Sequence, residues 1–481
     1  MPTQVVDVDL ETETGAVVRE TFSDLLIIAR DPSVSSPDYN VPNVYDTVSQ
    51  VASDFGSDSD AQVAAEEVSA RGARNWWVIM LESHEHTEVI GDSDSSSTDE
   101  GQVQNTPMRG GEENTEVTVD GDAQDLVFST ASPPDKPDTG QTAINTDTGE
   151  VVTGSSSSGS GSGIEVSYET LSWDEAQPEI ESHNFDLAVL ADTRADRSYL
   201  GEGDEMLSWV SSNDASMVLA YSNGNTFDTD EEGMDEAHEM GNYLTSGNVF
   251  PIAHKSNDDV AAGVAGRMAT RNPWFTAYMD GGANYSFAME QYRRSLIGRP
   301  STPGTFEGGD TDGGGGPCNV LYREMGTQIL SNSLSTAGAD SDYQYFDIAR
   351  TESFIVAEVE NALYGLRLSR ESIPFAPIGR TIIEATLRER LNRYVSPQGR
   401  ALSPEEIEQL GADSEQAFQL GPQRVSTHRG NVPLSNLDIH VPRYDELDRS
   451  DRANRVWTGI QITAQLAGNA HTFQVDLAVT V

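Results

Sequence analysis

The stretch from Val456 to Val481 constrains this chain most, because it reads as two consecutive β-strands. The apolar residues alternate with polar ones in each run: Ile460, Ile462, Ala464 and Leu466, then Phe473, Val475, Leu477, Val479 and Val481. Between the runs, Ala467–Ala470 carries the Gly-Asn pair of a tight turn. The pattern predicts a hairpin whose last strand has a free backbone edge. Such an edge must be covered, blunted or paired with another chain.

The charge balance indicates a protein built for molar salt. Among 481 residues there are 29 basic and 79 acidic side chains, a formal charge of −50, and Lys136 and Lys255 are the only lysines. At such salt the screening length falls to ~3 Å, which mutes the self-repulsion of the acidic surface. Regular apolar periodicity disfavours the alternative of an acidic, partly disordered protein. Direct binding to nucleic acid is excluded as a function, since phosphate contacts need a basic face.

Cysteine usage and hydropathy set further bounds. Cys318 is the only cysteine, so no internal disulfide and no thiolate metal cluster is expected. The beginning of the sequence lacks the basic start and apolar core of a signal peptide, and no run approaches ~18 apolar residues. We therefore expect a protein that is assembled in the cytoplasm and does not insert into a membrane.

Strand and helix patterns alternate along most of the chain, which predicts an α/β core with a mixed, largely parallel open sheet. The predicted strands are Val5–Leu10, Val17–Ala29 with its apolar end at Leu25–Ala29, Trp76–Leu81, Phe185–Ala191, Ala215–Tyr221, Asn248–Ala253, Tyr343–Ala349, one near Val425, and Leu434–Val441. The predicted helices are 43–55, capped by Asn43, then Ser59–Arg71, Asp204–Ser212, Asp230–Thr245, Asp258–Thr270, Tyr322–Leu334, Thr351–Arg370, Gly379–Val395 and a short acidic one from Pro404.

A β-rich domain interrupts this pattern. Ser, Gly, Asp and Thr dominate between His84 and Gly163, with short strand patterns at Glu116–Val119, Leu126–Ser129, Thr142–Asn145, Glu150–Thr153 and Ile164–Tyr168. We predict an N-terminal arm strand in 1–20, a core in 21–90 plus 170–454, an inserted β-rich, outward-facing domain in 91–169 and a C-terminal linking hairpin in 455–481.

Motifs for chemistry are weak. Asp228, Asp230, Glu232 and Glu239 fit a calcium-loop pattern, but a strand precedes them and Asp235 occupies an apolar position of that loop. The alternative interpretation is the acidic first turn of a helix. The sequence lacks a phosphate loop and a nucleophile elbow, so neither an enzyme nor a cofactor is expected. Asp347 and Arg350, before a long amphipathic helix, could pair at an interface or form a local ion pair.

Four stretches resemble the contractile tail sheath proteins of tailed viruses and related injection machines. The most specific is Ser450–Ile460, SDRANRVWTGI, followed by Leu466–His471, LAGNAH. The others are Tyr345–Arg350 before its helix, Tyr45–Trp77, and Val151–Trp173. They follow the order of that family and together span most of the chain, apart from the insertion at Gly91–Gly163.

The resemblance implies a structural subunit that forms stacked hexameric rings around a tail tube and contracts to drive the tube through a host envelope. It implies the tail tube, baseplate and tail terminator proteins as partners. It also implies that the N-terminal arm and C-terminal strand are exchanged between subunits by β-augmentation. The interface residues expected are Val5, Val8, Leu10, Arg350, Arg455, Phe473, Val475, Leu477 and Val479.

The acidic composition adds the expectation of a virus of a salt-loving host, an archaeon, with the protein residing in the virion. Three alternatives stay open: a sheath encoded by a cell, an α/β enzyme, and a calcium-binding surface protein. For the termini, pairing within one subunit is the alternative to exchange.

Overall fold

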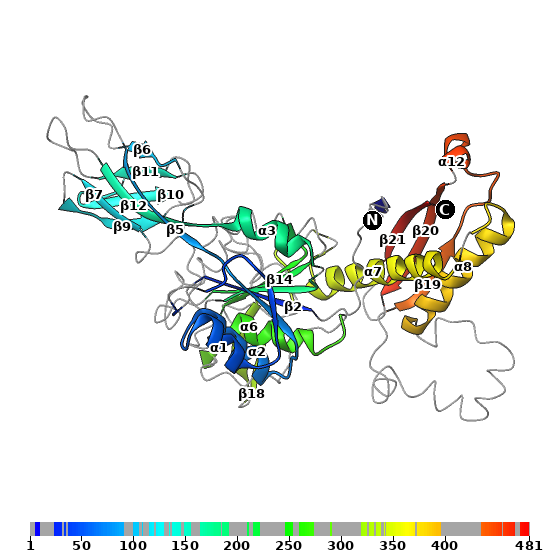
Figure 1. Cartoon of the computed structure of the whole chain (residues 1–481), viewed down its shortest axis with the longest axis horizontal. Coiled ribbons are helices and arrows are strands. Elements are labelled where there is room, and N and C mark those ends of the chain that lie inside the picture. Colours follow the sequence, from blue (N-terminus) through cyan, green and yellow to red (C-terminus); the bar gives the residue numbers. More distant parts are fainter. Residues whose placement is uncertain are drawn as a thin grey trace. The chain divides into compact units, whose positions relative to one another are not determined.

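The computed structural model divides into two compact units (Figure 1). Unit 1 comprises Met1–Glu20 and Thr351–Val481, and unit 2 comprises Thr21–Arg350. The structure describes residues 5–9, 24–30, 33–34, 37–90, 100–104, 108, 115–119, 122–128, 134, 137–145, 149–154, 164–183, 185–191, 209–210, 215–221, 246–253, 259–273, 289–290, 319–324, 327–330, 333–337, 341, 343–370, 373–395, 434–454, 456–466 and 472–480.

Unit 2 is built on a nine-stranded sheet in the order β16-β17-β15-β14-β13-β2-β4-β3, with β18 paired to β17. Its strands are β2 (Leu25–Ala29), β3 (Asn43–Tyr45), β4 (Trp76–Met80), β13 (Leu187–Leu190), β14 (Ser216–Tyr221), β15 (Val249–Ala253), β16 (Met289–Glu290), β17 (Asn319–Glu324) and β18 (Thr327–Leu330). Neighbours are parallel except for β3 on β4 and β18 on β17. The expected mixed, largely parallel α/β core is therefore present.

Helices cover the sheet because its central strands are apolar on both faces. On one face Leu25, Ile27 and Ala29 of β2 join a core with α1 (Val48–Phe55), α2 (Asp60–Ala70) and α6 (Val260–Ala269). On the other face Leu26 and Ile28 are equally buried, and Figure 1 shows α3 (Trp173–Glu181) on the side opposite to α6. This double burial explains why the strand sequences read as continuous apolar runs.

A buried ion pair joins the sheet to the start of α7 (Phe346–Ser369). Arg350 donates from Nη2 to Asp186 Oδ2 at 2.7 Å, and both side chains are 1% exposed. A second nitrogen of Arg350 donates to the carbonyl of Met268 at the end of α6, where a cation complements the helix dipole.

The β-rich insertion has a core of its own. Its two four-stranded sheets have the orders β5-β12-β7-β8 and β6-β11-β10-β9. The strands are β5 (Ser83–Ile90), β6 (Glu100–Gln102), β7 (Thr115–Val119), β8 (Asp122–Ala123), β9 (Asp125–Phe128), β10 (Gln141–Asn145), β11 (Glu150–Thr153) and β12 (Ile164–Leu171). Ile90, Val117, Ile144, Val151 and Val166 pack together between them.

Asn40 ties the two ends of the insertion together. Its amide nitrogen donates to Ser172 Oγ at 2.9 Å, while its amide oxygen accepts from the backbone N–H of Glu82 at 3.3 Å. Ser172 N–H in turn donates to the Glu82 carbonyl. Asn40 has φ +58, in the left-handed region that asparagine tolerates better than most residues.

Unit 1 combines a four-stranded sheet of order β1-β21-β20-β19 with helical elements. The strands are β1 (Val5–Asp9), β19 (Leu434–His440), β20 (Val456–Leu466) and β21 (Thr472–Thr480). The helical elements are the main part of α7, then α8 (Pro377–Leu391), the 3-10 turn η3 (Asn392–Tyr394) and α12 (Arg449–Asn454). The predicted terminal hairpin is confirmed, with β20 and β21 antiparallel.

Three predicted elements are wrong. The helix predicted to be capped by Asn43 begins at Val48, because residues 43–45 pair with β4 and the Gln50 side chain accepts from the Thr47 N–H at the true N-terminus. The helix predicted over Tyr322–Leu334 is the hairpin β17–β18, which extends the sheet beside β15. The strand predicted over Tyr343–Ala349 contains the start of α7, because Phe346 packs on Phe250 in the core and Arg350, one turn on, reaches Asp186. Strand β5 was not expected at all.

Other predictions fall on residues outside the description. These are the helix at Asp230–Thr245, most of that at Asp204–Ser212, the acidic helix from Pro404, the strand near Val425 and the turn at Ala467–Ala470. Among the described residues, no helix is long and apolar enough to span a membrane.

Candidate subunit interface at the terminal sheet

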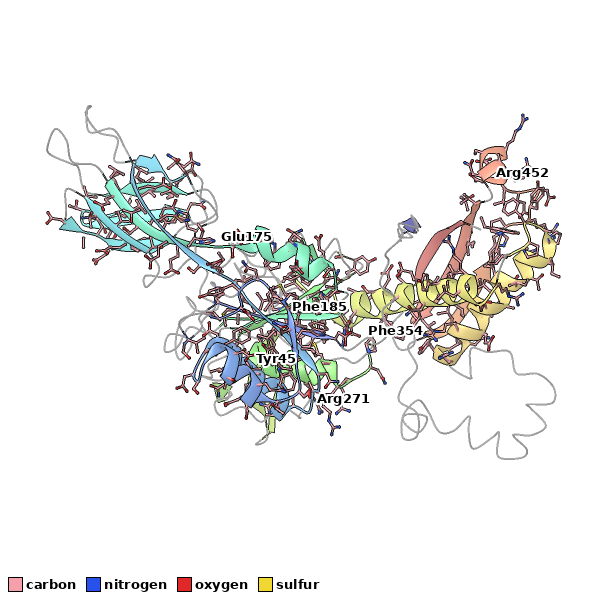
Figure 2. The ribbon with its side chains drawn as sticks, viewed as in Figure 1. Tyr45, Glu175, Phe185, Arg271, Phe354 and Arg452 are labelled. Atoms are coloured by element: carbon pink, nitrogen blue, oxygen red, sulfur yellow. The ribbon has the colours of Figure 1, made fainter. Side chains whose placement is uncertain are left out.

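Strand β20 is anchored by Trp457, which lies within the SDRANRVWTGI motif. The indole is fully buried, donates from Nε1 to the Pro442 carbonyl at 3.0 Å and packs edge-on against Phe375, with 4.8 Å between ring centroids. Phe375 also contacts Tyr444, over whose ring the Arg452 guanidinium lies at 5.5 Å (Figure 2 labels Arg452). The motif residue Trp457 is thus a packing anchor for the sheet.

A bulge follows this anchor. The pairing of β20 with β21 shifts register between Trp457 and Ile460, and Gly459 there has φ +70, a conformation that glycine adopts without strain. Thr458 Oγ1 donates to Asp451 Oδ2 at 2.6 Å, joining the bulge to α12. The spacing of Asp451, Trp457 and Gly459 in the motif therefore has a local structural explanation.

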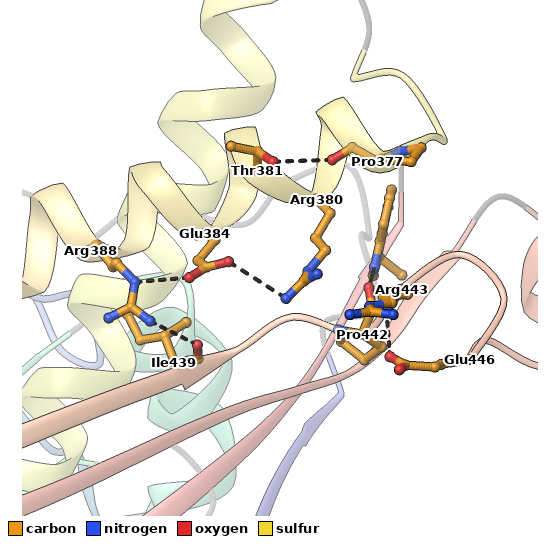
Figure 3. Close-up of polar contacts among 10 residues, drawn as sticks. Pro377, Arg380, Thr381, Glu384, Arg388, Ile439, Pro442, Arg443 and Glu446 are labelled. Carbon is orange, nitrogen blue, oxygen red and sulfur yellow. Dashed lines mark hydrogen bonds and ion pairs between the residues drawn. The ribbon is translucent and has the colours of Figure 1, made fainter.

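Helix α8 covers β19. Ile383, Leu387 and Leu391 are fully buried along one face of the helix. Arg388 bridges the two elements, since its Nε donates to Glu384 at 3.0 Å and its Nη2 donates to the Ile439 carbonyl at 3.1 Å (Figure 3). Glu384 also lies 3.9 Å from Arg380. The α8–β19 layer is fixed by both apolar and polar contacts.

Glu358 holds α7 to the end of α8. It accepts from Arg390 and from the Tyr394 hydroxyl, each at 2.7 Å. Burial, together with this hydrogen bond, raises the pKa of Tyr394 to about 12. The ring of Tyr394 also packs edge-on against Phe354 (labelled in Figure 2).

Strand β21 pairs with β20, and β1 pairs with the other edge of β21. Strand β1 pairs in parallel with β21 over five residues, from Val5 opposite Gln474 to Asp9 opposite Ala478. In the described sheet, β1 and β19 are the two edge strands. A short terminal strand thus occupies the edge that the sequence had marked as needing a partner.

The predicted interface residues are placed as follows. Val5 and Val8 lie in β1, with Val8 opposite Leu477, and Phe473, Val475 and Val479 lie in β21. Leu10 and Arg455 lie outside the described residues. Arg350 belongs to unit 2 and is buried on Asp186 within the chain. Sequence reasoning missed Phe375 and Pro442, whose contact with Trp457 joins segments distant in sequence and leaves no local signal.

The weak calcium candidate, Asp228, Asp230, Glu232 and Glu239, also lies outside the described residues. Within the described part of the chain, no group of three or more His, Cys, Asp or Glu side chains could hold a metal ion.

No protein-family model matches the chain, and no curated protein matches it. Among solved structures, a sheath tail protein from Desulfitobacterium hafniense is similar over 96% of this chain and 98% of its own, with 10% identity and a TM-score of 0.47. A chain of the anti-feeding prophage baseplate is similar over 97% of this chain and 91% of its own, with 11% identity and a TM-score of 0.47. A chain of the contracted PVC sheath complex, an extracellular contractile injection system, covers 93% and 88%, with 9% identity and a TM-score of 0.46.

Proposed function

We propose that the chain is the structural subunit of a contractile tail sheath. It polymerises as stacked hexameric rings around a tail tube, between a baseplate and a tail terminator, and its contraction drives the tube through a host envelope. The carrying observation is the terminal sheet, in which a short N-terminal strand completes the edge of the C-terminal hairpin. The SDRANRVWTGI motif, which supplies the anchor and bulge of that hairpin, supports the same function.

The terminal sheet suits strand exchange for a physical reason. A ladder of backbone hydrogen bonds forms equally well with a strand of the same chain or of a second copy, so β1 of one subunit can complete β21 of another. A neighbour in a ring offers its strand at high effective concentration, so pairing between copies competes with pairing within one chain. Head-to-tail links of this kind generate rings and helical tubes.

The assembly is tested by electron microscopy of the purified chain at molar salt. We expect helical tubes or stacked rings, and deletion of residues 472–480 should abolish them. Small single particles of the intact chain under these conditions contradict the proposal, and tubes that still form normally after the deletion contradict the role of β21 in assembly. Capsid and packaging genes beside this one favour a virus of a halophilic archaeon, whereas their absence favours a sheath encoded by a cell.

Strand exchange is tested by a disulfide between register partners. In a Cys318→Ser background, Val8→Cys with Leu477→Cys places two thiols opposite each other across β1 and β21. Oxidised tubes should then give a ladder of covalent oligomers on a denaturing gel. The matched control, Asp438→Cys with Thr463→Cys, joins β19 to β20 and should give cross-linked monomers. If both pairs give monomers, the exchange is refuted although the sheath function stands.

A further inference from the structure

The last turns of α7 expose an apolar stripe that the rest of the described chain does not cover. Leu368 is 71% exposed and Tyr364 is 42% exposed, although the first half of the helix is buried. Leu368 lies four residues after Tyr364 and three residues after Gly365, so it shares a face of the helix with both. We call these three residues the α7 stripe.

A glycine, Gly365, lies inside the helix on this same face. Glycine is among the least favourable residues inside a helix, because it loses the most backbone freedom on folding. A Cβ built at Gly365 meets no atom within 4 Å. Packing among the described residues therefore does not account for the glycine, whereas close approach of another molecule's backbone would.

The charge around the stripe identifies the chemistry of its partner. Arg367 and Arg370 are the charged residues of 361–370, and Glu360 and Glu371 flank this stretch. Both arginines are exposed, and no ion pair to either is seen within the described part of the chain. Tyrosine and arginine are enriched at the centres of protein interfaces. The partner surface is therefore apolar at its centre and acidic at its rim.

The chain itself has many more acidic than basic side chains. Residues 1–350 contain 62 acidic and 16 basic side chains, whereas residues 351–481 contain 17 acidic side chains against 13 arginines. The two parts are complementary between copies: an arginine-flanked stripe on one copy and an acidic surface on the next. We infer that the α7 stripe docks onto residues 21–350 of a second copy of this chain. The inference rests on the proposed self-assembly and adds a contact separate from the terminal strands.

The inference is tested with the full-length chain carrying Gly365→Leu, Leu368→Asp or Arg367→Glu. The matched control is Ala385→Leu, which places the same leucine side chain at an exposed position of α8. For each variant we measure the thermal midpoint of dilute monomer and the protein concentration at which tubes appear. Gly365→Leu should leave the midpoint unchanged or raise it, because the added side chain finds open space and leucine favours helix. Gly365→Leu and Leu368→Asp in the stripe, and Arg367→Glu beside it, should each need at least tenfold more protein to assemble, and the control should match the wild type.

The outcomes separate the two proposals. Wild-type tubes with unaffected stripe variants refute the stripe while leaving the sheath function intact. A large fall in the monomer midpoint for Gly365→Leu also refutes it, because the stripe would then be covered within one chain. If the wild type forms no tubes, the sheath function fails. Sedimentation of the dilute protein then tests the stripe proposal separately. Self-association of the wild type that the variants weaken supports the proposal, and a wild type that does not self-associate refutes it.

Discussion

Asp347 lies in the first turn of α7, where burial raises the pKa of its carboxyl to about 6 despite a hydrogen bond with Ser333. The ordinary value is 3.8, so the native chain holds this proton more tightly than the unfolded chain does. Its contribution to the free energy of unfolding is therefore fully present below pH 4 and is lost as the pH rises through 6.

Replacing Asp347 by asparagine removes this dependence. We compare the change in the free energy of unfolding caused by Asp347→Asn at pH 7 with the change it causes at pH 4. The value at pH 7 should be more stabilising by about 1–2 kcal/mol, a magnitude reduced because the side chain is partly exposed. Chemical denaturation at the two pH values measures it. Asp438→Asn, at an exposed position in β19, serves as the control. Equal effects of Asp347→Asn at both pH values would contradict the assignment.

At the scale of elements, the insertion is joined to the sheet of unit 2 through two neighbouring strand ends. Ser83 and Leu171 are direct partners across β5 and β12, and the insertion buries its apolar side chains in a core of its own. We expect a chain in which Asn-Gly replaces residues 84–170 to fold, because that pair makes a two-residue hairpin turn. Retained cooperative melting, within a few degrees of the intact chain, would be the supporting result.

The control for this excision is Asn40→Gly in the shortened chain. Glycine keeps the left-handed backbone of Asn40 but removes the side chain that joins Glu82 to Ser172. Loss of these buried hydrogen bonds should cost about 1–3 kcal/mol. A shortened chain that does not melt cooperatively would show that the core depends on the insertion.

The elements differ in how far the sequence predicts them. Strands β2, β4 and β13 are predictable because burial on both faces makes them continuous apolar runs. Residues 322–330 are not, because their strand character comes from pairing beside β15, which local sequence does not encode. At the candidate interface, the hairpin is visible in the alternation of β20 and β21. The residues that contact Trp457 cannot be predicted from the sequence, because Phe375 and Pro442 are distant from it along the chain and meet it only in the folded structure.

For the whole molecule, the uneven charge predicts uneven dependence on salt. Lowering the salt from about 1 M to about 0.15 M lengthens the screening distance from ~3 to ~8 Å, which strengthens repulsion among acidic side chains. Since residues 351–481 are nearly balanced in charge, we expect hydrogen exchange to speed up in β13, β14 and β15 while β20 changes little. A uniform loss of protection across both units would contradict this.

The pairing of β1 with β21 also has a consequence for biosynthesis. Val5 meets Gln474, so the first strand leaves the ribosome about 470 residues before its partner. At ~5–20 residues per second, β1 waits for roughly half a minute to a minute and a half with its backbone unpaired. During that time it is available to any finished chain nearby. A polysome of this messenger would then seed assembly on nascent chains, and the order of translation would set which end of a subunit is captured first.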